Sequence, residues 1–414
     1  MQPDEATALG ELAAGAVSGV AAQAQEVHAG IAGRVFDSLG PTASPVRVAH
    51  DLIAGGVYCA VRLTSGALAR GAGAAVGATR RAGAPSLGDT RGGARALGAL
   101  NGAVGDLLHD RASALETPMA VRRDGRDVAL NAPALAAAFP DAGGRLAVFV
   151  HGLGETDEAW RRRAARHPPY AERLRAELGY TPIHVRYNSG LHISHNGRRL
   201  AVLLAELTAN WPVEIAEISL IGHSMGGLVA RSACHYAGPG SWREQVEHVF
   251  MLGAPHHGAP LELAVNGATA ALSLFPETRG LARTLNARSA GVKDLRYGYL
   301  VDEDWEGHDP DALWHDTGTA IPFLREANHY FVSASLSRHP DHPVGRLFGD
   351  LLVRRGSAWS HRVRGGRVQF PVDRYRQVGA AHHFDLLNHP AVYEQIRRWI
   401  SGGRELAPPQ HGAD

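Results

Sequence analysis

The stretch Gly222-His223-Ser224-Met225-Gly226 constrains the fold of this chain more than any other feature. It follows the apolar run 218–221 and precedes the segment 228–234, in which apolar residues recur at helical spacing. The flanking glycines allow a sharp, strained turn that lifts the serine hydroxyl above a sheet, where the following helix N-terminus favours negative charge. We therefore predict a strand, a tight turn and a helix in immediate succession, with Ser224 as a candidate nucleophile.

Strand and helix patterns alternate through residues 116–404, which predicts one α/β domain with a mostly parallel central sheet flanked by helices. Asp124-Gly125 predicts a two-residue hairpin near its start. The looser stretch 259–327 lies between two expected strands and indicates a cap or lid insertion. We expect strands at 146–150, 183–187, 218–221, 248–252, 330–334 and 375–378. Helices are expected at 170–178, at 198–208, after the serine to about 236, and at 392–400, with a flexible tail at 405–414.

Residues 1–115 have a different character, being rich in Ala and Gly and poor in aromatic residues. Apolar residues at helical spacing predict several helices in this N-terminal segment. The glycines of 71–77 are expected to break one helical run, and those of 83–93 to form a loose joint. Two roles stay open for the segment: packing on the α/β domain, or lying on a membrane surface.

Composition narrows the class of protein. Of the 414 residues, 45% are hydrophobic and 20% charged, as in ordinary globular proteins, and a net charge of +1 gives no electrostatic case for nucleic-acid binding. Only Cys59 and Cys234 are present, so no disulfide framework is implied. Residues 1–5 lack the features of a secretory signal. The apolar run 52–61 ends at Arg62, short of the roughly 20 residues that span a bilayer. A cytoplasmic or peripherally membrane-associated protein is expected.

A serine nucleophile needs donors for the oxyanion that forms when it attacks a carbonyl. His151-Gly152-Leu153-Gly154 follows an expected strand, and its glycines let backbone N–H groups turn toward a substrate oxygen. We expect the Leu153 N–H and the Met225 N–H to form this oxyanion hole.

The serine also needs a base and an acid that orients the base, in the chain order serine, acid, histidine. Asp350 follows the strand expected at 330–334, and His382-His383 lie between the last strand and the last helix. We expect His383 to be the base because it directly precedes the apolar segment that anchors the final helix. The acids that rival Asp350 are Asp341, Asp373 and Asp385.

Five motifs together resemble bacterial lipases and esterases of the α/β-hydrolase superfamily, over residues 151–400. They are HGLGE from 151, GHSMGGLVARSA from 222, LGAPHHGAPLE from 252, GDLLV from 349 and HFDLLNHP from 383. The resemblance implies the α/β-hydrolase fold, ester hydrolysis, and a triad of Ser224, Asp350 and His383. It does not extend to residues 1–115.

The insertion carries apolar side chains that favour hydrophobic acyl esters as substrates. Leu274 and Phe275, together with His223 beside the nucleophile, are the expected substrate contacts. Two alternatives stay open: a polyester or thioester hydrolase with the same triad, and a catalytically silent hydrolase fold that binds a lipid or a partner. Peripheral membrane contact and the oligomeric state are left undecided.

Paired histidines raise the question of a metal. They lack accompanying cysteines and an H-E-x-x-H motif, so we expect neither a metal nor a cofactor. The pairs are His192 and His195, His256 and His257, and His339 and His342; we expect the second pair to shape a pocket wall.

Overall fold

The structure is a computed structural model of the 414-residue chain, which forms two compact units. One unit comprises Met1–Gly93, Leu107–Glu116 and Leu263–Arg288, and the other comprises Ala94–Asp106, Thr117–Glu262 and Ser289–Asp414. We refer to them as the N-terminal unit and the sheet unit. The residues that the structure describes are 1–40, 43–81, 83–256, 258, 259, 262, 269, 286–312, 316–335, 361–363, 366–368 and 374–402. The tail expected at 405–414 lies outside them.

The sheet unit is built on eight strands in the order β10-β7-β6-β5-β3-β4-β1-β2. Their bounds are β1 Ala120–Arg123, β2 Arg126–Val128, β3 Arg145–Val150, β4 Thr181–Arg186, β5 Glu217–His223, β6 Val246–Leu252, β7 Asn328–Ser335 and β10 Tyr375–Gly379. β1 pairs antiparallel with β2 and with β4, whereas the other neighbours are parallel. The mostly parallel sheet predicted from the sequence is therefore confirmed. A separate antiparallel pair consists of β8 His361–Val363 and β9 Gly366–Val368.

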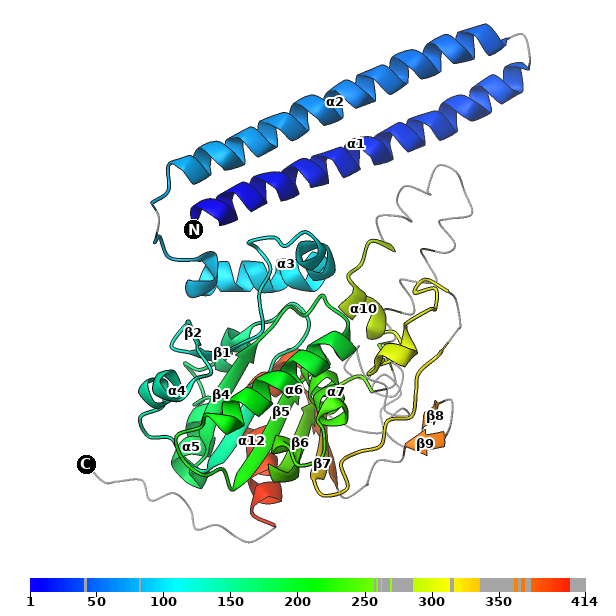
Figure 1. The fold of residues 1–414 in the computed structure, drawn as a ribbon. Helices are drawn as coiled ribbons and strands as arrows, with labels where there is room; N and C mark the ends of the chain where they lie inside the picture. Colours follow the sequence, from blue (N-terminus) through cyan, green and yellow to red (C-terminus); the bar gives the residue numbers. More distant parts are fainter. Residues whose placement is uncertain are drawn as a thin grey trace. The chain divides into compact units, whose positions relative to one another are not determined.

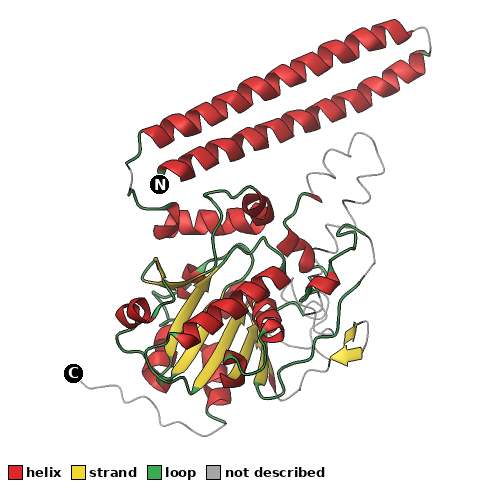
Figure 2. Cartoon of the chain, in the orientation of Figure 1, coloured by secondary structure: helices red, strands yellow, loops and turns green. Residues whose placement is uncertain are grey.

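Helices cover both faces of this sheet, as Figure 2 shows. Their bounds are α4 Ala132–Ala138, α5 Tyr170–Leu178, α6 Ile193–Ala209, α7 Met225–Tyr236, α10 Ala290–Asp294 and α12 Pro390–Ile400. On one face Leu204 of α6 and Leu228 of α7 pack with Val148 of β3. On the other, Tyr393 of α12 packs with Phe149 and its neighbours. Strands buried on both sides explain the continuous apolar runs in the sequence, because neither face of β3 or β5 meets water.

The predicted hairpin turn is confirmed in detail. Asp124 and Gly125 both have positive φ, 50° and 78°, and they join β1 to β2 with Arg123 opposite Arg126. This is the backbone that a two-residue hairpin turn requires. Within the expected insertion, the structure describes 286–312 and 316–327 as loops around α10 and a short 3-10 helix, Asp302–Asp304.

Helix α3, Arg91–Asp110, contributes its central residues 94–106 to the sheet unit. Its glycines allow very close packing. A Cβ on Gly102 would come within 2.7 Å of the Gly154 Cα, and the Asn188 side-chain amide donates to the Gly105 carbonyl at 2.8 Å. This helix therefore supports the turns that follow β3 and β4.

The N-terminal unit contains two long helices, α1 Pro3–Leu39 and α2 Ser44–Ala78, which lie side by side as a hairpin (Figure 1). The prediction that the glycines of 71–77 break a helix is wrong, because α2 continues to Ala78. Gly73 and Gly77 face α1, where a Cβ would come within 2.7 Å of the Gly10 Cα and 2.8 Å of the Pro3 carbonyl oxygen respectively. These glycines serve close helix packing and not a turn. Among the described helices, α2 alone is long and apolar enough to cross a membrane by length and composition.

Candidate active site

Ser224 stands on a strained turn between the end of β5 and the start of α7. Its backbone has φ 52° and ψ −124°, a conformation that costs a non-glycine residue on the order of 1–3 kcal/mol. The turn is held by hydrogen bonds from the Ser224 N–H to the Leu252 carbonyl at 2.8 Å and from the Gly227 N–H to the Ser224 carbonyl at 3.0 Å. A Cβ on Gly226 would come within 2.2 Å of the Val150 carbonyl oxygen, so glycine is required where the helix crosses the strands. The predicted strand, turn and helix are confirmed.

The turn after β3 lies directly against this serine. A Cβ on Gly152 would come within 3.0 Å of the Ser224 Cβ. The Gly152 N–H donates to Glu155 Oε2 at 2.7 Å and the Gly154 N–H donates to Ser189 Oγ at 2.9 Å. Among the described residues, no acceptor bonds the intervening Leu153 N–H, and the Met225 N–H at the first position of α7 is in the same situation. Two donors are thus left for a ligand oxygen.

His383 is buried at the same edge of the sheet. It begins a short 3-10 helix, His383–Leu387, after a loop that bonds the end of β7 through the Ala381 N–H and the Ser335 carbonyl at 3.0 Å. A Cβ on Gly253 would come within 2.8 Å of His383 Cε1. Because the Ser224 N–H bonds the carbonyl of the residue before Gly253, the histidine ring and the serine turn meet at the end of β6.

The neighbouring His382 is differently placed. Its side chain is 44% exposed, and its Nε2 lies 3.0 Å from Asp385 Oδ1. The same carboxylate oxygen lies 2.6 Å from Arg163 Nη2, and Asp385 Oδ2 accepts the His382 N–H at 3.1 Å. Both oxygens of Asp385 are therefore engaged with groups other than the His383 ring.

His223 is enclosed between the serine turn and the histidine loop. Its side chain has no exposed surface, its Nδ1 is 3.0 Å from Glu155 Oε2, and its Nε2 is 3.3 Å from the His383 carbonyl oxygen. The rings of His223 and His383 are 4.7 Å apart between centroids. Both of its ring nitrogens thus face protein groups, and the expected substrate contact by His223 stays a prediction.

Glu155 completes this arrangement, and sequence reasoning missed it although it ends the HGLGE motif. Burial raises the pKa of Glu155. The charge and hydrogen bond of His223 and the hydrogen bond from the Gly152 N–H together lower it by more, so the pKa of Glu155 lies below its ordinary value. An ionised carboxylate at neutral pH therefore links the turn after β3 to the residue preceding Ser224.

The position of these groups in the sheet decides the fold assignment. The serine turn follows β5, the second strand from β4 toward β10, and the histidine loop follows the edge strand β10. A strained nucleophile turn at the carboxyl end of such a sheet defines the superfamily architecture. The chain is an α/β hydrolase by fold.

Comparison with family models supports this fold assignment for one part of the chain. A family described as a PGAP1-like alpha/beta domain matches residues 201–308. No curated protein has a significantly similar sequence.

Comparison with solved structures finds similar chains at low sequence identity. The Bacillus licheniformis lipase BlEst2 in mature form is 19% identical, with a TM-score of 0.40 over 63% of this chain and 93% of that one. A lipase-esterase related protein from Clostridium acetobutylicum is 13% identical, with a TM-score of 0.32 over 62% and 94%. The peroxisomal alpha-beta-hydrolase Lpx1 from Saccharomyces cerevisiae is 11% identical, with a TM-score of 0.31 over 66% and 80%.

Several sequence-predicted site residues lie outside the described part of the structure. They are the acid Asp350, its rivals Asp341 and Asp373, and the expected acyl contacts Leu274 and Phe275. In the chain, β7 is the last described strand before Asp350. β7 ends at Ser335, beside β6 and at the edge where the Ser224 turn and His383 meet.

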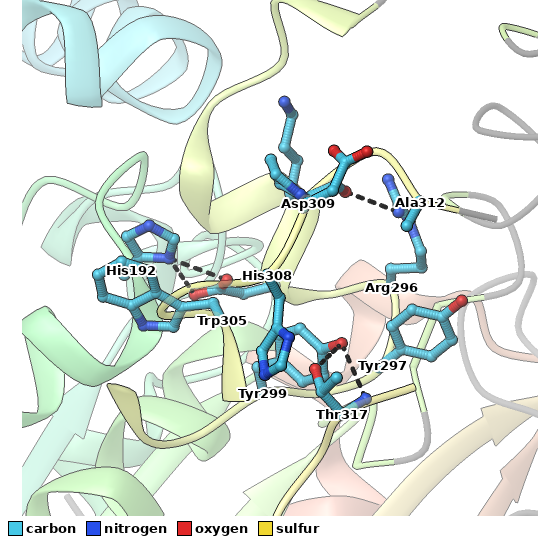
Figure 3. Close-up of a pocket in the computed structure, with 12 residues that line it drawn as sticks. His192, Arg296, Tyr297, Tyr299, Trp305, His308, Asp309, Ala312 and Thr317 are labelled. Atoms are coloured by element: carbon cyan, nitrogen blue, oxygen red, sulfur yellow. Dashed lines mark hydrogen bonds and ion pairs between the residues drawn. The ribbon is translucent and has the colours of Figure 1, made fainter. Parts of the chain in front are cut away.

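His192 and His195 lie at the start of α6, where they pack against Trp305 of the insertion. Figure 3 shows His192 beside Trp305. His192 Nδ1 lies 3.0 Å and 3.1 Å from the two oxygens of Asp294, and its ring stacks on Trp305 at 3.8 Å. The ring of His195 stands edge-on to Trp305 at 5.4 Å. Burial raises the pKa of Asp294, although His192 opposes this shift.

A small cavity of about 30 Å³ adjoins this cluster, with room for about one water molecule. No group of three or more metal-ligating side chains is found within the described residues. Of the other pairs, His256 lies 3.4 Å from Arg231, while His257, His339 and His342 fall outside the described residues.

Proposed function

We propose that the chain is a serine hydrolase that cleaves carboxylic esters through an acyl-enzyme on Ser224. The observation that carries the proposal is the strained turn of Ser224, packed against Gly152 on one side and bonded beside Gly253 on the other. Strain of this kind persists only where the surrounding structure enforces it, and it clusters at active sites.

In the proposed reaction, His383 takes the proton of Ser224 as the hydroxyl oxygen attacks the ester carbonyl. The carbonyl oxygen becomes an oxyanion, which accepts hydrogen bonds from the Leu153 and Met225 N–H groups. His383 then gives its proton to the departing alcohol oxygen, leaving the acyl group on Ser224. A water molecule repeats the sequence, so that the acid is released and the serine regains its proton.

The acid partner of His383 is proposed to be Asp350. It follows β7 in the chain, and β7 ends at the edge of the sheet where Ser224 and His383 meet. A carboxylate there would hold one imidazole tautomer and stabilise the imidazolium ion. The engagement of Asp385 with Arg163 and His382 supports this choice over Asp385.

His223 and Glu155 are proposed as positioning residues. The ionised Glu155 accepts the Gly152 N–H and pairs with His223, whose other ring nitrogen lies against the His383 carbonyl. One buried pair thus connects the turn that carries Leu153 with the loop that carries the base. Fixed supporting groups of this kind are what a catalytic constellation needs to keep its geometry.

Hydrophobic acyl esters are the proposed substrate class, because the insertion carries apolar residues that include Leu274 and Phe275. Replacing both with Ser should weaken the hydrolysis of long-chain esters more than that of short-chain esters. p-Nitrophenyl esters of graded acyl length would measure this difference. Equal losses at every length would instead indicate general destabilisation.

A fluorophosphonate probe tests the central proposal, since it reacts with an activated serine and not with an inert one. Wild-type protein should be labelled at Ser224, Ser224→Ala should not, and Ser241→Ala, which changes a serine on the loop before β6, should label like wild type. Failure of the folded wild-type protein to label or to hydrolyse any ester or thioester would favour the silent binding protein.

A further inference from the structure

The residues that lie between α1 and α2 in the hairpin are small or polar. Where the helices approach, Gly73 lies against Gly10, and Gly77 lies against Pro3. Further along, Arg62 Nη1 donates to Gln25 Oε1 at 2.6 Å, and His28 and His50 bring their Nε2 atoms within 3.3 Å of each other. A hairpin that folds in water normally buries its large apolar side chains between the helices, so this interior is unusual.

The outer surface of the same hairpin is aliphatic. The large apolar side chains that are more than half exposed include Leu52, Ile53, Val57, Leu63 and Leu68 of α2, with Val20 and Ile31 of α1. Leu52 and Ile53 are consecutive, so they point about 100° apart around the helix. The apolar surface is therefore broader than the single stripe that one partner helix would cover.

Charged residues mark off a band along both helices. In α2 only Arg62 is charged between Asp51 and Arg70, and in α1 only Glu26 is charged between Glu11 and Arg34. We call the stretches 12–33 of α1 and 52–69 of α2, each with one charged residue, the band. At 1.5 Å per residue, each stretch is about 30 Å long, which is the thickness of a bilayer's hydrocarbon core.

Two arginines are placed as a membrane requires. Arg62, the charge in the middle of the α2 band, is turned inward to Gln25. Beyond the band, near the connection between the helices, Arg47 forms an ion pair with Asp37 at 2.7 Å and both side chains are exposed. Polar side chains within a bilayer face the space between helices and pair there, whereas exposed charges are confined to the ends of the membrane-spanning segments.

We propose that the α1–α2 hairpin inserts into a lipid bilayer and anchors the sheet unit to it. Lipid supplies no hydrophobic drive between helices, so helix pairs in membranes associate through small residues that permit close contact. Gly10, Gly73 and Gly77 provide such a contact, and acyl chains cover the aliphatic exterior. This proposal does not depend on the hydrolase activity.

Membrane extraction of the full-length protein tests the anchor. Wild-type protein should stay with sedimented membranes after an alkaline carbonate wash and dissolve only in detergent. Leu52→Glu with Leu63→Glu, inside the band, should lower the membrane-bound fraction at least tenfold. The matched control is Val46→Glu with Val48→Glu, at exposed valines outside the band, and it should change that fraction less than twofold. Circular dichroism would show that all variants keep their helices.

Cys59 offers a second measurement, because it is exposed within the band while Cys234 is buried. An environment-sensitive fluorophore on Cys59 should shift to the blue on adding phosphatidylcholine–phosphatidylglycerol vesicles and be quenched by lipid-borne but not by aqueous quenchers. Release of the protein by carbonate, or a monomer that stays soluble without detergent, would overturn the proposal. So would an oligomer that forms without detergent and shields Cys59 from labelling, because other copies of the chain would then cover the aliphatic surface. These measurements of membrane binding use no ester substrate, so failure of the membrane proposal can be distinguished from failure of the hydrolase proposal.

Discussion

The imidazole of His383 lies against the backbone of Gly253, so closely that a Cβ on this glycine would come within 2.8 Å of ring Cε1 and 3.0 Å of Nδ1. Gly253 is the first residue after β6 and has φ 67°, a backbone conformation that favours glycine. The absence of a side chain at residue 253 thus determines where the proposed base can stand.

Gly253→Ala is expected to lower turnover of an ester by about 10²-fold, because a displacement of a catalytic group by about 1 Å costs roughly that much. The matched control is Gly179→Ala, since Gly179 has φ 71° with no atom within 4 Å of an added Cβ. Both variants should lose about 1 kcal/mol of stability from the backbone conformation. Steady-state kinetics and thermal unfolding would separate the two effects, and equal turnover in both variants would show that the Gly253 contact does not position the base.

Ser224→Ala should lose on the order of 10⁶ in turnover while the fold survives, as expected when a triad nucleophile is removed. Ester hydrolysis measured at high enzyme concentration, with circular dichroism as the check on folding, would establish this. Near-wild-type turnover in this variant would exclude the serine mechanism.

His383→Ala should abolish turnover, whereas His382→Ala should cost about tenfold or less. The reason is that His383 is buried beside the serine turn, while His382 is 44% exposed and paired with Asp385. Parallel kinetics on the two variants, each with a p-nitrophenyl ester, would compare them. If His382→Ala were the inactive variant, the base would be His382 and not His383.

Asp350→Asn should lower turnover by up to about 10⁴ through the wrong imidazole tautomer. Asp385→Asn should instead weaken stability, since Asp385 pairs with Arg163 and His382, and should leave turnover within about tenfold. Rates and unfolding midpoints measured for both variants would distinguish these roles. Full activity in Asp350→Asn would direct the search to Asp341 and Asp373.

His329 predicts a pH dependence of stability. Burial, with the nearby charge of Arg231, lowers the pKa of His329 from 6.5 to about 4. Between these pH values the unfolded chain binds a proton that the folded chain refuses, so the free energy of unfolding falls as pH drops from 6.5 to 4. The loss from this residue amounts to roughly 3 kcal/mol at most.

His329→Gln should remove this contribution to the pH dependence. Urea unfolding of wild type and variant at pH 7, 5.5 and 4 would show their stability difference changing in favour of the variant as the pH falls. A difference that stays constant over that range would mean that His329 titrates alike in both states.

Local chemistry in the sequence determined most of the sheet unit's elements. Apolar runs predicted the strands because a strand buried on both faces has no polar side, and Gly222 and Gly226 predicted the turn because no Cβ fits beside Gly227 or Val150. The hairpin at Asp124-Gly125 follows from the same local rule, since both residues adopt positive φ. In each case the residues that decide the structure are close together in the chain.

Only the tertiary structure decided features that depend on distant residues. The glycines of 71–77 continue a helix because Gly10 and Pro3 of α1 lie against them, and no local rule contains those neighbours. The pairing of His223 with Glu155 and the contact of Gly253 with the His383 ring join residues at or after the ends of different strands. Their proximity is set by the order of the strands in the sheet, which side-chain periodicity within one segment does not encode.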